Sequence, residues 1–306
     1  MRNFLAVSVL LNILYPDFAF IAELKINNAQ ELINFAKKVN AGTTYSGYTV
    51  YLNTGIEFTS ALSQQFPMIG NFLGIFNGQG HTISNLKLSA SAPNLGLFGY
   101  STGLTIQNLV IDSFCSITNT GSRSGLRYTG GFIGCCDSNA KLCSIENSVN
   151  MADVSFTGST GNDVAVGGFA GRIYYGALFR NCANYGTVTN SGSGSPIHIG
   201  GLVGDFDHNS RNVINCFNYG KIKNSVAVAN RVWVGGLIGE IREGTVAVTN
   251  CANSGTFTYT QSDSVGNIVG AGAANNTIHH CFGLTTLIAW SPPGQVHRLQ
   301  PCQKHP

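Results

Sequence analysis

A short glycine block that returns about every 35 residues constrains this chain more than any other feature. Consecutive copies are separated by steps of 37, 33 and 35 residues. The four regular copies are Gly130-Gly131-Phe132-Ile133-Gly134, Gly167-Gly168-Phe169-Ala170-Gly171, Gly200-Gly201-Leu202-Val203-Gly204 and Gly235-Gly236-Leu237-Ile238-Gly239. A unit of this length is too short to bury a core of its own, so it must stack on its neighbours.

Each repeat contains short runs of β-branched and aromatic residues separated by Asn-Gly-type turn triplets, and no helical pattern lies inside it. Charged residues make up 10% of the chain, and 38 of its 306 residues are glycine. An average soluble domain has about 25% charged residues, and a helical bundle needs charged outer faces. The pattern therefore predicts an all-β chain whose coils stack about 4.8 Å apart as a β-solenoid.

A second block keeps the same period and places like residues above one another. The asparagines of this block form two columns: Asn147, Asn181, Asn215 and Asn250, and Asn150, Asn184, Asn218 and Asn253. Stacked amides can hydrogen-bond along the axis of the rod. Cys182, Cys216, Cys251 and Cys281 form a further column, which we interpret as small buried apolar side chains. Cys115, Cys135, Cys136 and Cys143 cluster earlier, where a disulfide is plausible in a secreted protein.

The glycine block also predicts a bend. The two positions after the paired glycines are apolar in every copy, as in Phe169 and Ala170. Neighbouring residues of a flat strand point to opposite faces, so both cannot reach the core unless the strand bends there.

The two ends of the chain differ from the array. Residues 1–22 resemble a secretory signal, the alternative being an apolar first strand. Residues 23–60 are expected to cap the solenoid, with a helix at about 29–40 and a strand at Tyr48–Leu52. Asn28 and Glu31 match a capping box for that helix. The repeats then occupy 61–285, and the proline-rich segment 286–306 is expected to be a loose tail.

At this point the residues resemble a known family, the GLUG repeat. The resemblance rests on the Gly-Gly-Leu-Val-Gly block, on the Asn-Cys-x-Asn-x-Gly element and on the stretch from Gly74 to Leu86, and it covers about residues 23–285. It implies a right-handed parallel β-helix on a secreted or cell-surface protein. Such arrays occur in adhesin-like proteins and beside the catalytic parts of immunoglobulin A peptidases. The repeats carry no established catalytic residues, so none is transferred to this chain.

One set of charged residues allows an enzymatic alternative. Arg172, Asp205 and Glu240 each follow a glycine block directly, so stacking places them in one column. Two positions later the corresponding column holds Tyr174, Asp207 and Arg242. Carboxylates about 5 Å apart serve in retaining glycoside cleavage, so a polysaccharide lyase or hydrolase would use Asp205, Asp207, Glu240 and Arg172. The competing interpretation is a solvated ladder of alternating charge.

A polar strand face supplies the candidate binding residues. After the Asn-x-Gly turn, successive coils present Thr187 and Thr189, Lys221 and Lys223, and Thr256 and Thr258. Tyr185 and Tyr219, with Trp233 on a neighbouring strand, offer rings on which sugars can stack. The plainer alternatives are β-propensity on an exposed strand and ordinary packing.

The sequence also limits the classes of function. No basic run is present, which argues against nucleic-acid binding, and no segment of the mature chain is long and apolar enough to span a membrane. Neither a His-Glu-x-x-His motif nor a Cys-x-x-Cys pair occurs, so we expect no metal and no cofactor. The sequence favours a non-catalytic, adhesin-like module that binds an extracellular glycan or protein, with a purely structural surface rod as a third possibility.

Overall fold

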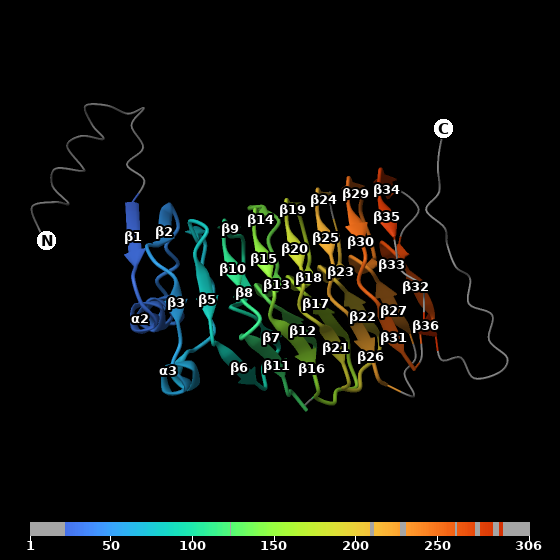
Figure 1. The fold of residues 1–306 in the computed structure, drawn as a ribbon, viewed down its shortest axis with the longest axis horizontal. Helices are drawn as coiled ribbons and strands as arrows, with labels where there is room; N and C mark the ends of the chain where they lie inside the picture. The colour runs from blue at the N-terminus through green and yellow to red at the C-terminus, as the bar shows by residue number, and fades with distance from the viewer. Residues whose placement is uncertain are drawn as a thin grey trace, which may run out of the picture.

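The chain forms a straight rod of stacked coils (Figure 1). The computed structural model describes residues 22–122, 124–208, 211–226, 231–260, 262–272, 276–283 and 288–289. The segment expected to be a signal lies outside the described residues, except for Ala22. Most of the expected tail also lies outside them, but Ile288–Ala289 forms strand β36, which pairs with β31 (Phe257–Tyr259). The array of coils therefore reaches beyond the boundary at 285.

Each coil crosses five parallel sheets, which we name A, B, D, E and C in the order in which the chain visits them. Sheet A contains β1 (Ala22–Ile26), β2 (Tyr48–Leu52), β4 (Ile75–Asn77), β9 (Thr105–Gln107), β14 (Cys143–Glu146), β19 (Ala177–Arg180), β24 (Arg211–Ile214), β29 (Val246–Thr249) and β34 (Thr277–His279). Sheet B contains β3 (Ile56–Glu57), β5 (Thr82–Ser84), β10 (Val110–Ile111), β15 (Val149–Asn150), β20 (Ala183–Asn184), β25 (Phe217–Asn218), β30 (Ala252–Asn253) and β35 (Phe282–Gly283).

The other three sheets complete the coil. Sheet D contains β6 (Lys87–Ala90), β11 (Ser116–Asn119), β16 (Asp153–Phe156), β21 (Val188–Asn190), β26 (Ile222–Asn224), β31 and β36. Sheet E contains β7 (Asn94–Leu95), β12 (Arg127–Gly130), β17 (Val164–Gly167), β22 (Ile197–Gly200), β27 (Val232–Gly235) and β32 (Ser264–Gly266). Sheet C contains β8 (Phe98–Ser101), β13 (Ile133–Cys136), β18 (Ala170–Ile173), β23 (Val203–Phe206), β28 (Ile238–Ile241) and β33 (Val269–Gly272). The predicted parallel β-helix is thereby confirmed.

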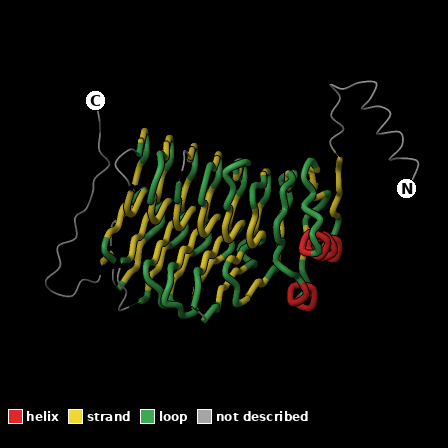
Figure 2. Tube along the Cα trace, turned by 180° about the vertical axis from the view of Figure 1, so that it is seen from behind, coloured by secondary structure: helices red, strands yellow, loops and turns green. Residues whose placement is uncertain are grey.

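Two helices lie at the N-terminal end of the rod (Figure 2). Helix α2 (Ala29–Asn40) matches the predicted cap, and the Oδ1 of Asn28 accepts a hydrogen bond of 2.9 Å from the backbone N–H of Glu31. Its apolar face is buried at Leu32, Ile33, Ala36 and Val39. Strand β2 has the predicted bounds, whereas β1 and the short helix α3 (Ser60–Gln65) were not predicted.

The predicted bend lies between sheets E and C. Strand β17 ends at Gly167 and β18 begins at Ala170, and the side chains of Phe169 and Ala170 are both fully buried. A Cβ atom at Gly168 would lie 2.3 Å from the carbonyl oxygen of Gly201 in the next coil, so only glycine allows the coils to approach this closely.

The bend divides the interior into two apolar regions. One cluster of buried residues is lined mainly by sheets A, B and C, with residues of D and E joining it in the first coils. It includes the stacked rings of Phe132 and Phe169, whose centroids are 4.7 Å apart. A second cluster, which includes Val166 and Val188, lies between sheets D and E. The faces of E and C that do not belong to these two clusters meet across the bend, and that is where charged residues gather.

The buried asparagine ladder forms as predicted, whereas the exposed ladder joins Asn147, Asn181 and Asn215 but does not extend to Asn250. In the buried ladder, Nδ2 of Asn184 donates to Oδ1 of Asn218 at 2.8 Å, and Asn218 donates to Asn253 in the same way at 2.8 Å. In the exposed ladder, Asn181 has a φ of 53° and donates to Asn147 at 2.8 Å. The eight described cysteines are buried free thiols, so the disulfide considered for the early cluster is not present in this structure. Among the described residues, no helix has the length and apolar character needed to cross a membrane.

Candidate functional site: a buried charge cluster and an exposed aromatic face

The stacked charges predicted from the repeat are neighbours in sheet C. The strand register pairs Arg172 with Asp205, and Asp205 with Glu240. Nε of Arg172 lies 3.2 Å from Oδ2 of Asp205, and Arg172 also pairs with Asp207. The period of the sequence was therefore sufficient to bring these four residues together.

A second column faces them across the bend. On sheet E the register aligns Tyr128, Ala165, His198 and Trp233 in successive coils. Nδ1 of His198 lies 3.0 Å from Oε2 of Glu240 in sheet C. The Tyr128 hydroxyl accepts a hydrogen bond from the Arg172 guanidinium, which also lies over the ring of Tyr174 at 4.1 Å.

Sequence reasoning missed two members of the cluster, Asp163 and His198. Asp163 lies in the loop just before β17, where no repeat block marks it. Its Oδ2 lies 3.0 Å from Nη1 of Arg172, and its Oδ1 lies 2.9 Å from Nε2 of His198. Arg242, which the sequence placed one coil from Asp207, also pairs with Asp163. His198 stands two residues before a glycine block, so the sequence gives its column. That column can be assigned to the charge cluster only when the angle of the bend is known.

The cluster is nearly closed to solvent. Asp205 and His198 are 0% exposed, Arg172 is 4% exposed and Asp207 is 6% exposed. Nε of Arg242 approaches Oδ2 of Asp205 at 3.0 Å, whereas Oδ1 of Asp205 has no hydrogen-bond partner among the described residues. A charge cluster this deeply buried is stable only because each ion has an opposite charge beside it.

The burial and pairing shift the pKa values in different directions. Burial raises the pKa of Asp205. Burial also opposes charging of His198, but its hydrogen bonds with Asp163 and Glu240 prevail and raise its pKa to about 9. Burial similarly works against ionisation of Asp163, yet the hydrogen bond and charge of His198, aided by Arg242 and Arg172, lower the pKa of Asp163 overall. This raised pKa favours the imidazolium form of His198 at neutral pH.

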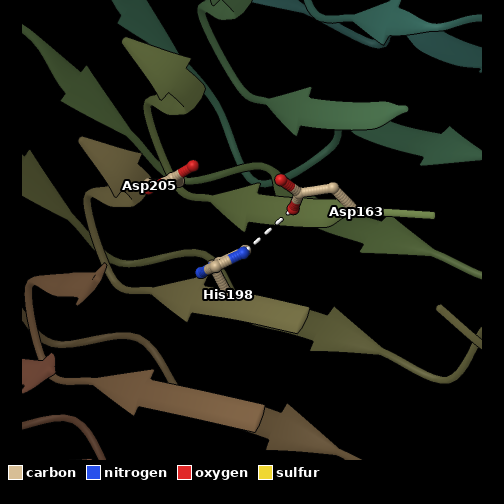
Figure 3. A group of neighbouring side chains, drawn as sticks. All are labelled: Asp163, His198 and Asp205. Carbon is tan, nitrogen blue, oxygen red and sulfur yellow. Dashed lines mark ion pairs between the residues drawn. The ribbon is translucent and has the colours of Figure 1, made fainter. Parts of the chain in front are cut away.

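The geometry decides how well the cluster suits a metal ion. Donor atoms of Asp163, His198 and Asp205 all lie within 4.8 Å of one another, and Figure 3 shows the three side chains converging. However, the guanidinium groups of Arg172 and Arg242 already contact both carboxylates. The positive charge at this place is supplied by side chains, and a metal ion would have to displace them. A second group, Asp207, His208 and Glu243, lies at the rim of the cluster and has the same spacing.

The predicted binding residues lie on a different face. In sheet D, Thr189 pairs in register with Lys223, and Lys223 with Thr258. The backbone N–H of Thr187 donates to Oδ1 of Asp153 at 2.8 Å. Lys221 and Thr256 are exposed, while Thr187, Thr189 and Lys223 are half-buried. The structure places these six residues in two neighbouring columns on one outward face.

Of the aromatic residues proposed to accompany that column, Trp233 lies apart from the two tyrosines. Tyr185 and Tyr219 stack at a centroid distance of 4.7 Å and an angle of 12°, and they are 51% and 48% exposed. Trp233 instead lies on sheet E, where its ring stacks on that of His198 at 5.0 Å. Trp233 thus packs beside the charge cluster and not beside the two tyrosines.

The chain was compared with known proteins in three ways. No protein-family model and no curated protein sequence matches it. A crystal structure of a candidate immunoglobulin A1 protease from Bacteroides ovatus is similar in fold, with a TM-score of 0.58 and 22% sequence identity. The match covers 90% of this chain and 76% of that one. At this identity the similarity establishes the fold alone: the chain is a parallel β-helix.

Proposed function

We propose that this protein is a non-catalytic, secreted or cell-surface β-helix module of the adhesin-like type, which binds a glycan or protein through its outward strand faces. The resemblance to GLUG repeats supports this proposal, as does the rod shape, because a rod displays the same column of side chains coil after coil. Affinity would then arise from many modest contacts along the axis.

The observation that carries the proposal is the burial of the candidate catalytic carboxylates. Asp205 has no exposed surface, and Asp207 is paired with Arg172. A glycosidase needs a carboxylic acid and a carboxylate that both touch the scissile bond. These carboxylates pair with arginines and histidines instead, whereas the outward column of Thr187, Lys221 and Thr256 meets solvent. The arrangement favours a structural role for the charges and a binding role for the exposed face.

The structural neighbour supports the fold and nothing finer. That protein is described as a candidate immunoglobulin A1 protease, and at 22% identity no activity is transferred from it. A surface or secreted location for this chain agrees with the signal-like N-terminal sequence and with the family resemblance.

The proposal is tested by a binding screen together with an activity assay. The purified protein is immobilised and exposed to a panel of extracellular polysaccharides and matrix proteins, and a double variant, Lys221→Gln with Lys223→Gln, serves as the comparison. We expect saturable binding that the double variant weakens. In parallel, the polysaccharides are assayed for new reducing ends or unsaturated products. Product that disappears in Asp205→Asn would replace this proposal with the enzymatic one, and absence of any binding would favour a purely structural rod.

A further inference from the structure

Small and aromatic side chains follow one another on the exposed side of sheet B. Its outward column holds Val149, Ala183, Phe217, Ala252 and Phe282 in successive coils, and the register pairs Ala252 with both phenylalanines. Phe282 is 65% exposed. The small side chain of Ala252 therefore lies between two phenylalanines that come from the coils on either side, and we call the position above it the slot.

The width of the slot suits a single ring. Parallel strands are spaced at about 4.8 Å, so Phe217 and Phe282, two coils apart, have backbones about 10 Å apart. One coil spacing is also a ring-stacking distance in this molecule, since the rings of Tyr185 and Tyr219 are 4.7 Å apart on successive coils. A ring seated over Ala252 would thus stack on Phe217 on one side and on Phe282 on the other.

The edges of the slot are polar. On one side the turn residue Asn250 is exposed, its side-chain amide has no partner among the described residues, and His280 occupies the same turn position in the next coil. On the other side lies the hydroxyl of exposed Ser254, beyond which Tyr219 extends the wall made by Phe217, with ring centroids 6.3 Å apart. Apolar faces above and below with hydrogen-bonding groups at the rim match a pyranose ring, which has C–H faces and hydroxyls around its edge.

The charge around the slot is positive. Residues 211–226, 244–260 and 276–283, which supply its walls and surroundings, contain no Asp or Glu. Lys221 follows Tyr219 by two residues and is exposed, and no ion pair joins Lys221 or Lys223 to a described residue. An anionic ligand is favoured in such a field, particularly at low salt.

We propose that this slot binds one hexuronic acid residue of an acidic polysaccharide, with the sugar ring between Phe217 and Phe282 and its carboxylate toward Lys221. This inference rests on the proposed binding function and names its ligand class. An aromatic side chain of a protein partner has the right thickness, but it carries at most one or two hydrogen-bonding groups. A sugar ring has hydroxyls around its whole edge, so a rim that is polar on both sides favours the sugar.

The test uses the full chain and two matched variants. Ala252→Phe fills the slot, whereas Ala183→Phe adds the same ring to the same column one coil before Phe217 and leaves the slot open. Binding of polygalacturonate and alginate is measured by titration calorimetry, with dextran as the neutral comparison and a tyrosine-rich peptide as the protein-like ligand. We expect the uronate polymers to bind, Ala252→Phe to weaken binding by about tenfold or more and Ala183→Phe by less than about twofold. Lys221→Gln should reduce both the affinity and its dependence on salt.

Several outcomes separate the failure of the slot from the failure of the binding function. Uronate binding that Ala252→Phe leaves unchanged would overturn the slot while the binding function stands. Slot-dependent binding of dextran would overturn the acidic specificity, and slot-dependent binding of the peptide would overturn the sugar. If the wild type binds none of these ligands, the slot proposal fails, and the matrix-protein arm of the earlier screen decides the binding function by itself. Circular dichroism and thermal melts of both variants show whether each has folded.

Discussion

Two regions of this rod that lie outside its apolar clusters use the same stacking geometry in opposite ways. Between sheets E and C, residues of opposite charge lie above one another, as in Arg172, Asp205 and Glu240, and the bend closes over them. On sheets B and D, rings and neutral or basic side chains are stacked, as in Tyr185 and Tyr219, and nothing described covers them. In the first region each charge has an opposite charge beside it within the fold, whereas the second region leaves hydrogen-bonding groups and ring faces open to a ligand.

This difference shows that a ladder of charged or aromatic residues is not by itself a catalytic or binding site. A buried carboxylate whose partners are all internal stabilises the fold, because separating it from them is costly. An exposed ring or lysine contributes little to stability and keeps its capacity for a ligand. The following predictions test that contrast, beginning with the largest effect.

Removing one cation from the cluster should cause the largest loss of stability. Arg172→Met leaves Asp163, Asp205 and Asp207 without a shared buried partner, and we expect the free energy of unfolding to fall by about 3–5 kcal/mol. Arg180→Met is the matched control, since Arg180 is exposed and lies 3.7 Å from Glu146, and it should cost less than about 1 kcal/mol. Urea unfolding measures both variants, and equal costs would show that burial does not distinguish the two regions.

His198 should make the stability fall at alkaline pH. Its pKa is raised from 6.5 to about 9 in the folded chain. A raised pKa means that the proton stabilises the folded state fully below about pH 6.5 and that this stabilisation, up to about 3 kcal/mol, is lost as the pH rises through about 9. Unfolding free energies between pH 6 and pH 9.5 should show this decline, and His198→Asn should flatten it. A flat wild-type profile would contradict the imidazolium.

The buried asparagine ladder should be sensitive at its centre. Asn218 accepts from Asn184 at 2.8 Å and donates to Asn253 and to the carbonyl of Gly220, so Asn218→Ala leaves buried polar groups unpaired. We expect a loss of about 2–3 kcal/mol. In the exposed ladder, Asn215→Gly keeps the positive φ of 52° and removes one bond that water can replace, so it should cost less than about 1 kcal/mol. Thermal melts of the two variants provide the comparison.

The exposed rings should have the smallest effect on stability. Tyr219→Ala removes a stacked pair whose partner stays half-exposed, and we expect a change of about 1 kcal/mol or less in the free energy of unfolding. If the same variant loses ligand affinity while its melting curve is nearly unchanged, the exposed rings serve binding, in contrast to the buried charges, which serve stability. A loss of several kcal/mol would assign the ring to the core of the fold.

Much of the fold and part of the charge cluster could be predicted from local sequence and from the repeat period. The helix over Ala29–Asn40, the stacking of Arg172 on Asp205 and the bend after the paired glycines were all predicted, because each depends on local sequence or on a constant step between coils. Asp163 and His198 were missed, since one lies in a loop without a repeat block and the other reaches the cluster only across the bend. The separation of Trp233 from the tyrosines was missed for the same reason.

The sequence by itself determined the columns of this protein: a fixed period in parallel, in-register strands places like positions about 4.8 Å apart whatever their chemistry. Only the tertiary structure decided which columns face one another and which face water. That choice depends on the angle at the paired glycines, where sheets E and C fold together and enclose the charges. The slot over Ala252 stays open for the opposite reason: it lies on a sheet face that no other described sheet covers.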